Sequence, residues 1–177
     1  MLDRLRHPGI AQIYTVGTHE ISGQMVPFFV MEYIPNAQSL TQYANAQKLS
    51  THERLAVFAK VCEAVAHGHQ KGVIHRDLKP GNVLVDSSGQ PKVIDFGVAR
   101  STDSDLALTT MQTDVGALIG TLQYKSPEQF DADPSDLDVR LDVYALGVIL
   151  YELLTGQPPY NVKQVGQDRL ALGPFKR

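Results

Sequence analysis

The octapeptide His75–Asn82, His-Arg-Asp-Leu-Lys-Pro-Gly-Asn, constrains this chain more than any other stretch. It places a carboxylate (Asp77), an ammonium (Lys79) and a carboxamide (Asn82) within six residues, and its Pro-Gly pair forces a loop. A carboxylate can accept a hydroxyl proton, an ammonium can meet a phosphoryl oxygen, and an amide oxygen can hold Mg²⁺. The loop therefore indicates metal-assisted phosphate chemistry.

Two further motifs follow the octapeptide in a fixed order, Asp95-Phe96-Gly97 and Ser126-Pro127-Glu128. Together the three resemble the catalytic loop, the DFG motif and the APE motif of protein kinases, and the resemblance covers roughly residues 2–160. It is closest to bacterial serine/threonine kinases. The resemblance implies an α+β, protein kinase-like fold, mostly the helical C-lobe with a remnant of the N-lobe sheet. We expect a single domain over 1–177, with 1–34 as N-lobe remnant and hinge, 35–160 as C-lobe and 161–177 as a divergent tail.

Composition narrows the class of protein and its surroundings. A length of 177 residues fits one domain, and 43% hydrophobic with 20% charged residues is typical of soluble globular chains. The net charge of −3 and the lack of a basic run argue against a nucleic-acid partner. The single cysteine, Cys62, excludes an internal disulfide and fits a reducing compartment, so we expect a cytoplasmic location. We find no signal peptide and expect no membrane segment in this chain.

The first part of the chain predicts a β-hairpin followed by a hinge. Ile10–Val16 and Met25–Tyr33 have strand character, and residues 21–24 are turn-like. These strands resemble the last two of the N-lobe, and Leu2 and Ile13 take apolar positions of the family's regulatory spine, although both could simply be core. In the hinge, Met31 takes the gatekeeper position, and the backbone of Glu32 and Ile34 is implied to face adenine.

A capping box, Ser50-Thr51-His52-Glu53, predicts the start of a long amphipathic helix, and Gly72 predicts its end. We expect Cys62 on its buried face as a structural rather than reactive thiol. His67 and His69 near the helix end are interpreted as structural or solvated, because no Cys or His cluster supports a metal site. The predicted buried positions of this helix are Leu55, Phe58, Cys62, Val65 and Ala66.

Short strands are predicted around the motifs. Val73–Ile74 is expected to be a two-residue strand before the octapeptide, and 83–85 with 91–94 a hairpin before Asp95. The hairpin is expected to hold Asn82 and Asp95 at neighbouring strand ends, where two oxygen ligands can converge on Mg²⁺. Leu84 resembles the apolar floor beneath adenine, and it could equally be core.

Residues 97–121 form a long Ser-, Thr-, Asp- and Gly-rich loop, which the resemblance makes the activation loop. Its threonines could be phosphorylated and pair with Arg76, or could be solvated loop residues; they are Thr109, Thr110 and Thr113. The segment 120–129 resembles the substrate-docking segment. It departs from the family in Leu122 and Lys125, where Pro and Met are common, and Thr121 resembles the threonine that bonds the catalytic Asp and Lys.

The stretch Asp142–Gly156 is apolar nearly all round, so we expect a helix buried on all sides and too short to span a bilayer. It resembles the central C-lobe helix. Asp142, at its start, is implied to accept hydrogen bonds from the backbone near His75 and Arg76.

The resemblance implies a serine/threonine protein kinase that transfers the γ-phosphate of ATP to Ser/Thr hydroxyls of a protein substrate, with ATP and Mg²⁺ as cofactors. Lys79 favours Ser/Thr over Tyr specificity. The alternative is a catalytically inactive kinase-like module that binds other proteins. The implied catalytic residues are Asp77, Lys79 and Thr121, the metal ligands are Asn82 and Asp95, and the nucleotide-binding residues are Met31, Glu32, Ile34, Lys79, Asn82, Leu84 and Asp95.

Parts of the family pattern have no match in these 177 residues, namely the Gly-rich loop, the ATP-binding lysine, its glutamate and the last C-lobe helices. We therefore expect a kinase domain cut at both ends, with weak ATP affinity and little turnover. One of the unmatched residues is the arginine that pairs with Glu128. A buried Glu128 without that partner would destabilise the fold by about 3–5 kcal/mol.

Overall fold

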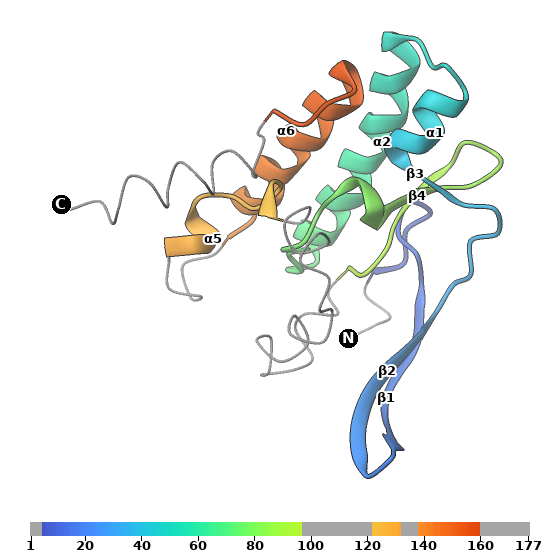
Figure 1. Ribbon diagram of the computed structural model, residues 1–177, viewed down its shortest axis with the longest axis vertical. Coiled ribbons are helices and arrows are strands. Elements are labelled where there is room, and N and C mark those ends of the chain that lie inside the picture. Colours follow the sequence, from blue (N-terminus) through green and yellow to red (C-terminus); the bar gives the residue numbers. More distant parts are fainter. Residues whose placement is uncertain (1–4, 97–121, 132–137, 160–177) are drawn as a thin grey trace. The chain divides into compact units, whose positions relative to one another are not determined.

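The computed structural model describes residues 5–96, 122–131 and 138–159 (Figure 1). The chain divides into two compact units, one of residues 1–75 and 80–98 and the other of residues 76–79 and 99–177. Some sequence predictions lie outside the described residues: those for Leu2, Thr109, Thr110, Thr113, Thr121 and the tail.

The first unit begins with the predicted hairpin, in which β1 (Ile13–Ile21) pairs antiparallel with β2 (Gln24–Met31). The two turn residues, Ser22 and Gly23, both have positive φ, 52° and 81°, as tight hairpin turns require. The hairpin is confirmed, but its first strand starts at Ile13 rather than Ile10. The reason is that the preceding residues pair elsewhere, since Ile10 bridges to Val93.

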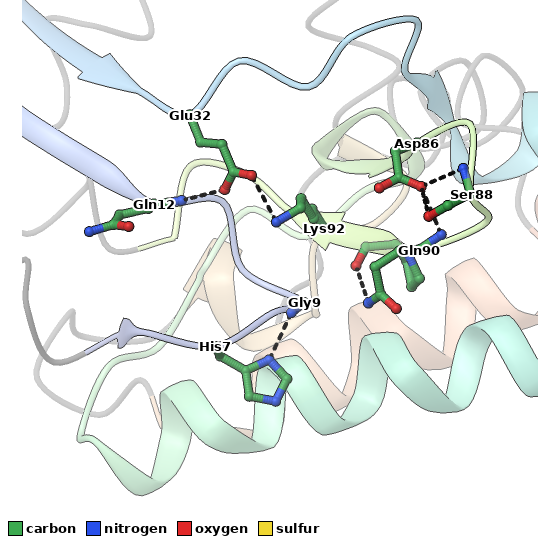
Figure 2. Close-up of polar contacts among 9 residues, drawn as sticks. His7, Gly9, Gln12, Glu32, Asp86, Ser88, Gln90 and Lys92 are labelled. Atoms are coloured by element: carbon green, nitrogen blue, oxygen red, sulfur yellow. Dashed lines mark hydrogen bonds and ion pairs between the residues drawn. The ribbon is translucent and has the colours of Figure 1, made fainter.

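The segment before β1 packs closely on the long helix α2 (Thr51–Gln70). A Cβ on Gly9 would meet the Ala64 Cβ at 2.9 Å, so only glycine allows this approach. The Gly9 amide donates to His7 Nδ1 at 3.0 Å (Figure 2). Burial, followed by the nearby charge of His67, lowers the pKa of His7, and Glu63 opposes this only in part.

Helix α2 begins and ends as predicted. The Ser50 amide donates to Glu53 Oε2 at 2.8 Å and the Glu53 amide to Ser50 Oγ at 3.4 Å, which completes the capping box. At the other end, Gly72 has φ 73°, and the amides of Gly72 and Val73 reach back to the last turn. The predicted strand Val73–Ile74 does not form, because the Val73 amide donates to the Gly68 carbonyl at 3.0 Å instead.

The buried face of α2 differs from the prediction. Leu55 is 43% exposed, Ala66 is exposed and Cys62 is half-buried, and burial raises the pKa of the Cys62 thiol. Gly68 belongs to the buried face because the Phe96 ring lies against it, where a Cβ would come within 2.2 Å of Phe96 Cζ. The face of α2 that is buried is therefore the face that carries Gly68 and lies against the Phe96 ring. Its buried residues are Val57, Phe58, Val61, Ala64, Val65 and Gly68.

A short helix, α1 (Leu40–Ala46), precedes α2, and a three-stranded antiparallel sheet holds β3 (Gln38–Ser39), β4 (Val83–Val85) and β5 (Pro91–Val93) in that order. The predicted hairpin of β4 and β5 is confirmed, with Val83 opposite Val93. Its turn is closed by Asp86 Oδ1, which accepts from the amides of Ser88 and Gln90 (Figure 2).

The second unit contains α5 (Glu128–Asp131) and α6 (Arg140–Thr155), which ends at Gly156 with φ 79°. The prediction of a helix buried on all sides is wrong, since Val143 and Tyr151 are 59% and 49% exposed. Its buried residues share one face at helical spacing. They are Leu141, Asp142, Ala145, Val148, Ile149 and Leu153.

No helix in the described part of the chain is both long and apolar enough to cross a membrane.

Candidate functional site

The predicted metal ligands lie at neighbouring strand ends of the first unit. Asn82 ends the 3₁₀ turn η2 (Pro80–Asn82) immediately before β4, and it is buried with 7% exposure. The Ile94 amide, just after β5, donates to the Asn82 carbonyl at 3.0 Å. Asp95 follows Ile94 in the left-handed backbone region, with φ 60°. The register of β4 and β5 thus brings the amide residue and the acid residue to the same end of one hairpin.

His75 holds the backbone next to Asp95, a role that sequence reasoning missed. Its ring is 1% exposed, and its Nε2 lies 2.9 Å from the Ile94 carbonyl oxygen. Because a carbonyl only accepts, Nε2 carries the proton in this contact. The ring also meets Phe96 edge-on, with 5.1 Å between the ring centroids. Its position at the start of the octapeptide is the only sequence signal that points to this residue.

The predicted hinge is held by side-chain contacts of Glu32 that could not be predicted from the sequence. Glu32 Oε1 pairs with Lys92 Nζ at 2.9 Å, and Glu32 Oε2 accepts from the Gln12 amide at 3.3 Å (Figure 2). The Glu32 amide donates to the Gln12 carbonyl at 2.7 Å. The Glu32 amide is therefore used inside the protein, whereas the implied adenine contact uses its carbonyl. Lys92 lies between two buried residues on β5. This alternation in the sequence indicates that its side chain points away from the buried face, but it does not indicate Glu32 as its partner.

The other predicted nucleotide-binding residues of this unit have mixed burial. Met31, at the end of β2, and Leu84, on β4, are both half-buried, and Ile34 is 8% exposed. The side chains of Met31 and Leu84 can therefore supply apolar surface without being sealed in the core, whereas that of Ile34 is buried.

The second unit holds the predicted catalytic acid between two ammonium groups. Lys79 Nζ lies 3.3 Å from Asp77 Oδ2, and Lys125 Nζ lies 3.0 Å from Asp77 Oδ1. Lys125 Nζ also donates to the Arg76 carbonyl at 3.0 Å. Sequence reasoning paired Asp77 with Lys79 in one loop and treated Lys125 only as a departure from the family pattern. The structure adds Lys125 to this group.

The backbone before Asp77 is strained and is held on both sides. Arg76 has φ 68°, a conformation that costs a non-glycine residue about 1–2 kcal/mol. Its amide donates to Asp142 Oδ1 at 2.8 Å and its carbonyl accepts from Gln129 Nε2 at 2.9 Å. The prediction that Asp142 accepts from this backbone is confirmed, although α6 starts two residues earlier, at Arg140. Strain of this kind persists only where the surroundings determine it, and it is frequent at functional sites.

The segment around Lys125 is anchored on α6. The hydroxyl of Tyr124, a residue that is 7% exposed, donates to Glu152 Oε2 at 2.5 Å. Burial and then the Glu152 carboxylate raise the pKa of Tyr124 well above its ordinary value. The expected burial of Glu128 is wrong, since this side chain is exposed. The inward position belongs instead to Gln129, whose Oε1 accepts from the amide of the buried Ser126 at 3.0 Å.

Among the described residues, no group of three or more His, Cys, Asp and Glu side chains is arranged to hold a metal ion. Asn82 carries a carboxamide and Asp95 a carboxylate, and Mg²⁺ takes oxygen ligands of these two kinds together with phosphate oxygens and water.

The chain is similar in sequence to known protein kinases. A family model described as the protein kinase domain matches residues 1–171. The chain is 40% identical over 156 residues to the serine/threonine-protein kinase PknB of Mycobacterium leprae, covering 88% of this chain and 24% of that protein. It is 41% identical over 158 residues to PknB of Mycobacterium tuberculosis, covering 89% of this chain and 24% of that protein. A probable serine/threonine-protein kinase of Corynebacterium efficiens is 39% identical over 158 residues, with 89% and 23% covered. The chain thus spans about a quarter of the length of these relatives.

Proposed function

Because the chain belongs to the protein kinase domain family, we propose that it is part of a serine/threonine protein kinase, which transfers the γ-phosphate of ATP to a protein hydroxyl. The observation that carries the proposal is the fixed position of Asp77, on a strained turn held by Asp142 and between two ammonium groups. Phosphoryl transfer depends mostly on positioning and charge stabilisation, which this arrangement favours. We also propose one kinase domain over the whole chain, with 1–34 as N-lobe remnant and hinge and 35–160 as C-lobe.

In this proposal Asp77 is the catalytic base. Its carboxylate accepts the proton of the attacking serine or threonine hydroxyl, which must come within about 2.6–3.2 Å. Lys79 offsets the negative charge that develops on the transferred phosphoryl group. Thr121, outside the described residues, is assigned to hold Asp77 and Lys79 through its hydroxyl, by family resemblance.

The nucleotide residues lie in the first unit. Asn82 and Asp95 would hold Mg²⁺, because a carboxamide and a carboxylate are the oxygen ligands this hard cation prefers. Bound Mg²⁺ would neutralise charge on the phosphates of ATP. The Glu32 carbonyl and the Ile34 amide would meet the adenine edge. Met31, at the gatekeeper position, and Leu84, as the apolar floor, would supply its apolar surroundings.

The substrate is proposed to be a protein with serine or threonine acceptors. Lys79, two residues after the base, favours these over tyrosine, and the matched relatives carry serine/threonine-protein kinase names. A cytoplasmic location is proposed because ATP is the phosphoryl donor and Cys62 is the only cysteine. The net charge of −3 gives no support to a nucleic-acid partner.

A second candidate is a kinase-like module that binds proteins without catalysis. Both candidates share the fold, so only activity separates them.

The test uses the purified chain, Mg-ATP labelled at the γ-phosphate, and either the chain itself or a generic basic protein as acceptor. Transfer that disappears in Asp77→Asn supports the kinase. A chain that is folded by circular dichroism and transfers no phosphate is not an active kinase by itself, which is the outcome expected of the binding module.

A further inference from the structure

Within the described part of the chain, Lys125 makes two polar side-chain contacts, and both go to the loop that carries the proposed catalytic acid. Its Nζ lies 3.0 Å from Asp77 Oδ1 and 3.0 Å from the Arg76 carbonyl oxygen. The ammonium thus bridges the carboxylate and the peptide group directly before it. Both side chains are partly shielded from water, with 26% exposure for Lys125 and 39% for Asp77.

Three side chains hold the strained turn at Arg76, but they act differently. Asp142 accepts from the Arg76 amide, and Gln129 donates to the Arg76 carbonyl. Both therefore fix backbone groups. Lys125 accepts no backbone proton but donates both to the Arg76 carbonyl and to the carboxylate of Asp77. It connects the placement of residues 122–129 with the orientation of the acid.

We propose that Lys125 is a positioning residue for Asp77, an inference that rests on the proposed kinase function. The terminal torsion of an aspartate is broad, so each ion pair on the carboxylate narrows the range over which its plane can turn. Lys79 supplies one such pair, on Oδ2 at 3.3 Å. A second ammonium on the other oxygen, held in turn by a backbone carbonyl, fixes the plane.

The orientation of this plane matters for the reaction. The substrate hydroxyl has to approach a carboxylate oxygen within hydrogen-bonding distance and along a lone-pair direction. Each carboxylate oxygen has two lone pairs, so accepting from Lys125 does not by itself use up the accepting capacity of that oxygen. Lys125 therefore restricts the carboxylate to one orientation and leaves it able to accept the proton.

The test compares four chains in the γ-phosphate transfer assay: wild type, Lys125→Met, Lys125→Arg and Lys60→Met. Methionine has a similar length without the charge, and arginine keeps the charge. Lys60 is an exposed residue of α2 and serves as the matched control. We expect Lys125→Met to lower kcat by about 10- to 100-fold, as small misplacements of catalytic groups do, with the KM for ATP changed by less than about twofold. Lys125→Arg should regain most of the loss, and Lys60→Met should behave as wild type.

Two results, one from the transfer assay alone and one from that assay combined with thermal unfolding, would overturn the proposal. One is a kcat for Lys125→Met equal to that of Lys60→Met. The other is an equal loss in Lys125→Met and Lys125→Arg together with a lowered unfolding midpoint, which would show a purely structural role.

A wild-type chain without transfer would overturn the proposed activity of this chain, and a second measurement then decides the role of Lys125. Unfolding midpoints are measured for wild type, Lys125→Met, Asp77→Asn and the double variant. A smaller effect of Lys125→Met in the Asp77→Asn background supports the bridge. Strictly additive shifts show that the two side chains do not interact, and the proposal fails.

Discussion

The close contact between Gly68 and Phe96 gives a prediction in which two opposing effects can be weighed. Replacing a helical glycine by alanine normally stabilises a helix by about 0.8–1.0 kcal/mol. At Gly68, however, the new methyl group would lie 2.2 Å from Phe96 Cζ and 2.4 Å from Cε1, well inside van der Waals contact. Overpacking a filled core typically costs about 1–3 kcal/mol, and the ring has little room to move because Phe96 is 2% exposed.

Because a 2.2 Å approach is severe, we take the steric cost at the upper part of this range, about 2–3 kcal/mol, and expect Gly68→Ala to destabilise the chain by about 1–2 kcal/mol after the gain in helix propensity. Gly147→Ala is the matched control, since Gly147 is also in a helix and a Cβ there meets no described atom within 4 Å. The control should stabilise by about 1 kcal/mol. Both changes are measured by thermal unfolding followed by circular dichroism, where the midpoint temperature shifts by roughly 2–4 °C per kcal/mol for a chain of this size.

Two observations would refute this reasoning. Gly68→Ala could raise the midpoint as Gly147→Ala does, which would mean that the ring and the helix separate at little cost. Alternatively, adding Phe96→Leu to Gly68→Ala could fail to recover stability, although the smaller side chain relieves the overlap.

Two further predictions concern partly buried hydrogen bonds. Asp142→Ala removes the acceptor of the Arg76 amide, so we expect a loss of about 1.5–3 kcal/mol in unfolding free energy and reduced phosphate transfer; unchanged stability in urea titrations would contradict it. His7 keeps Nδ1 unprotonated to accept from Gly9, and its pKa lies below the ordinary value of 6.5. As the pH falls below 6.5, the unfolded chain therefore binds a proton that the folded chain resists, and stability decreases. His7→Asn retains an acceptor without titrating, so its midpoint should fall less between about pH 7.5 and 5.5 than that of wild type; an equal fall would show that His7 is not responsible.

Local sequence signals located most elements near the candidate site. The capping box and Gly72 marked both ends of α2, because helix ends depend on backbone groups that nearby residues satisfy. The turn at Ser22-Gly23 and the one after Asp86 marked the two hairpins for the same reason. Local sequence patterns therefore predicted an element correctly where the hydrogen bonds that define it join residues close in the chain.

Local signals failed where a distant group decided the outcome. Hydrophobic periodicity favoured Leu55 and Ala66 as buried, but the buried face of α2 includes Gly68, against the Phe96 ring. Val73 has the composition of a strand residue, yet its amide completes the end of α2.

The family, the α+β fold and the loop that presents Asp77 and Lys79 could be predicted from the amino-acid sequence, because they follow from motifs whose residues are close in the chain. Only the tertiary structure revealed the Glu32–Lys92 pair at the hinge and the Lys125 bridge to Asp77. Both contacts join residues that are far apart in sequence. A lysine carries no local signal of its partner, because its long side chain can reach any acceptor that folding brings near it.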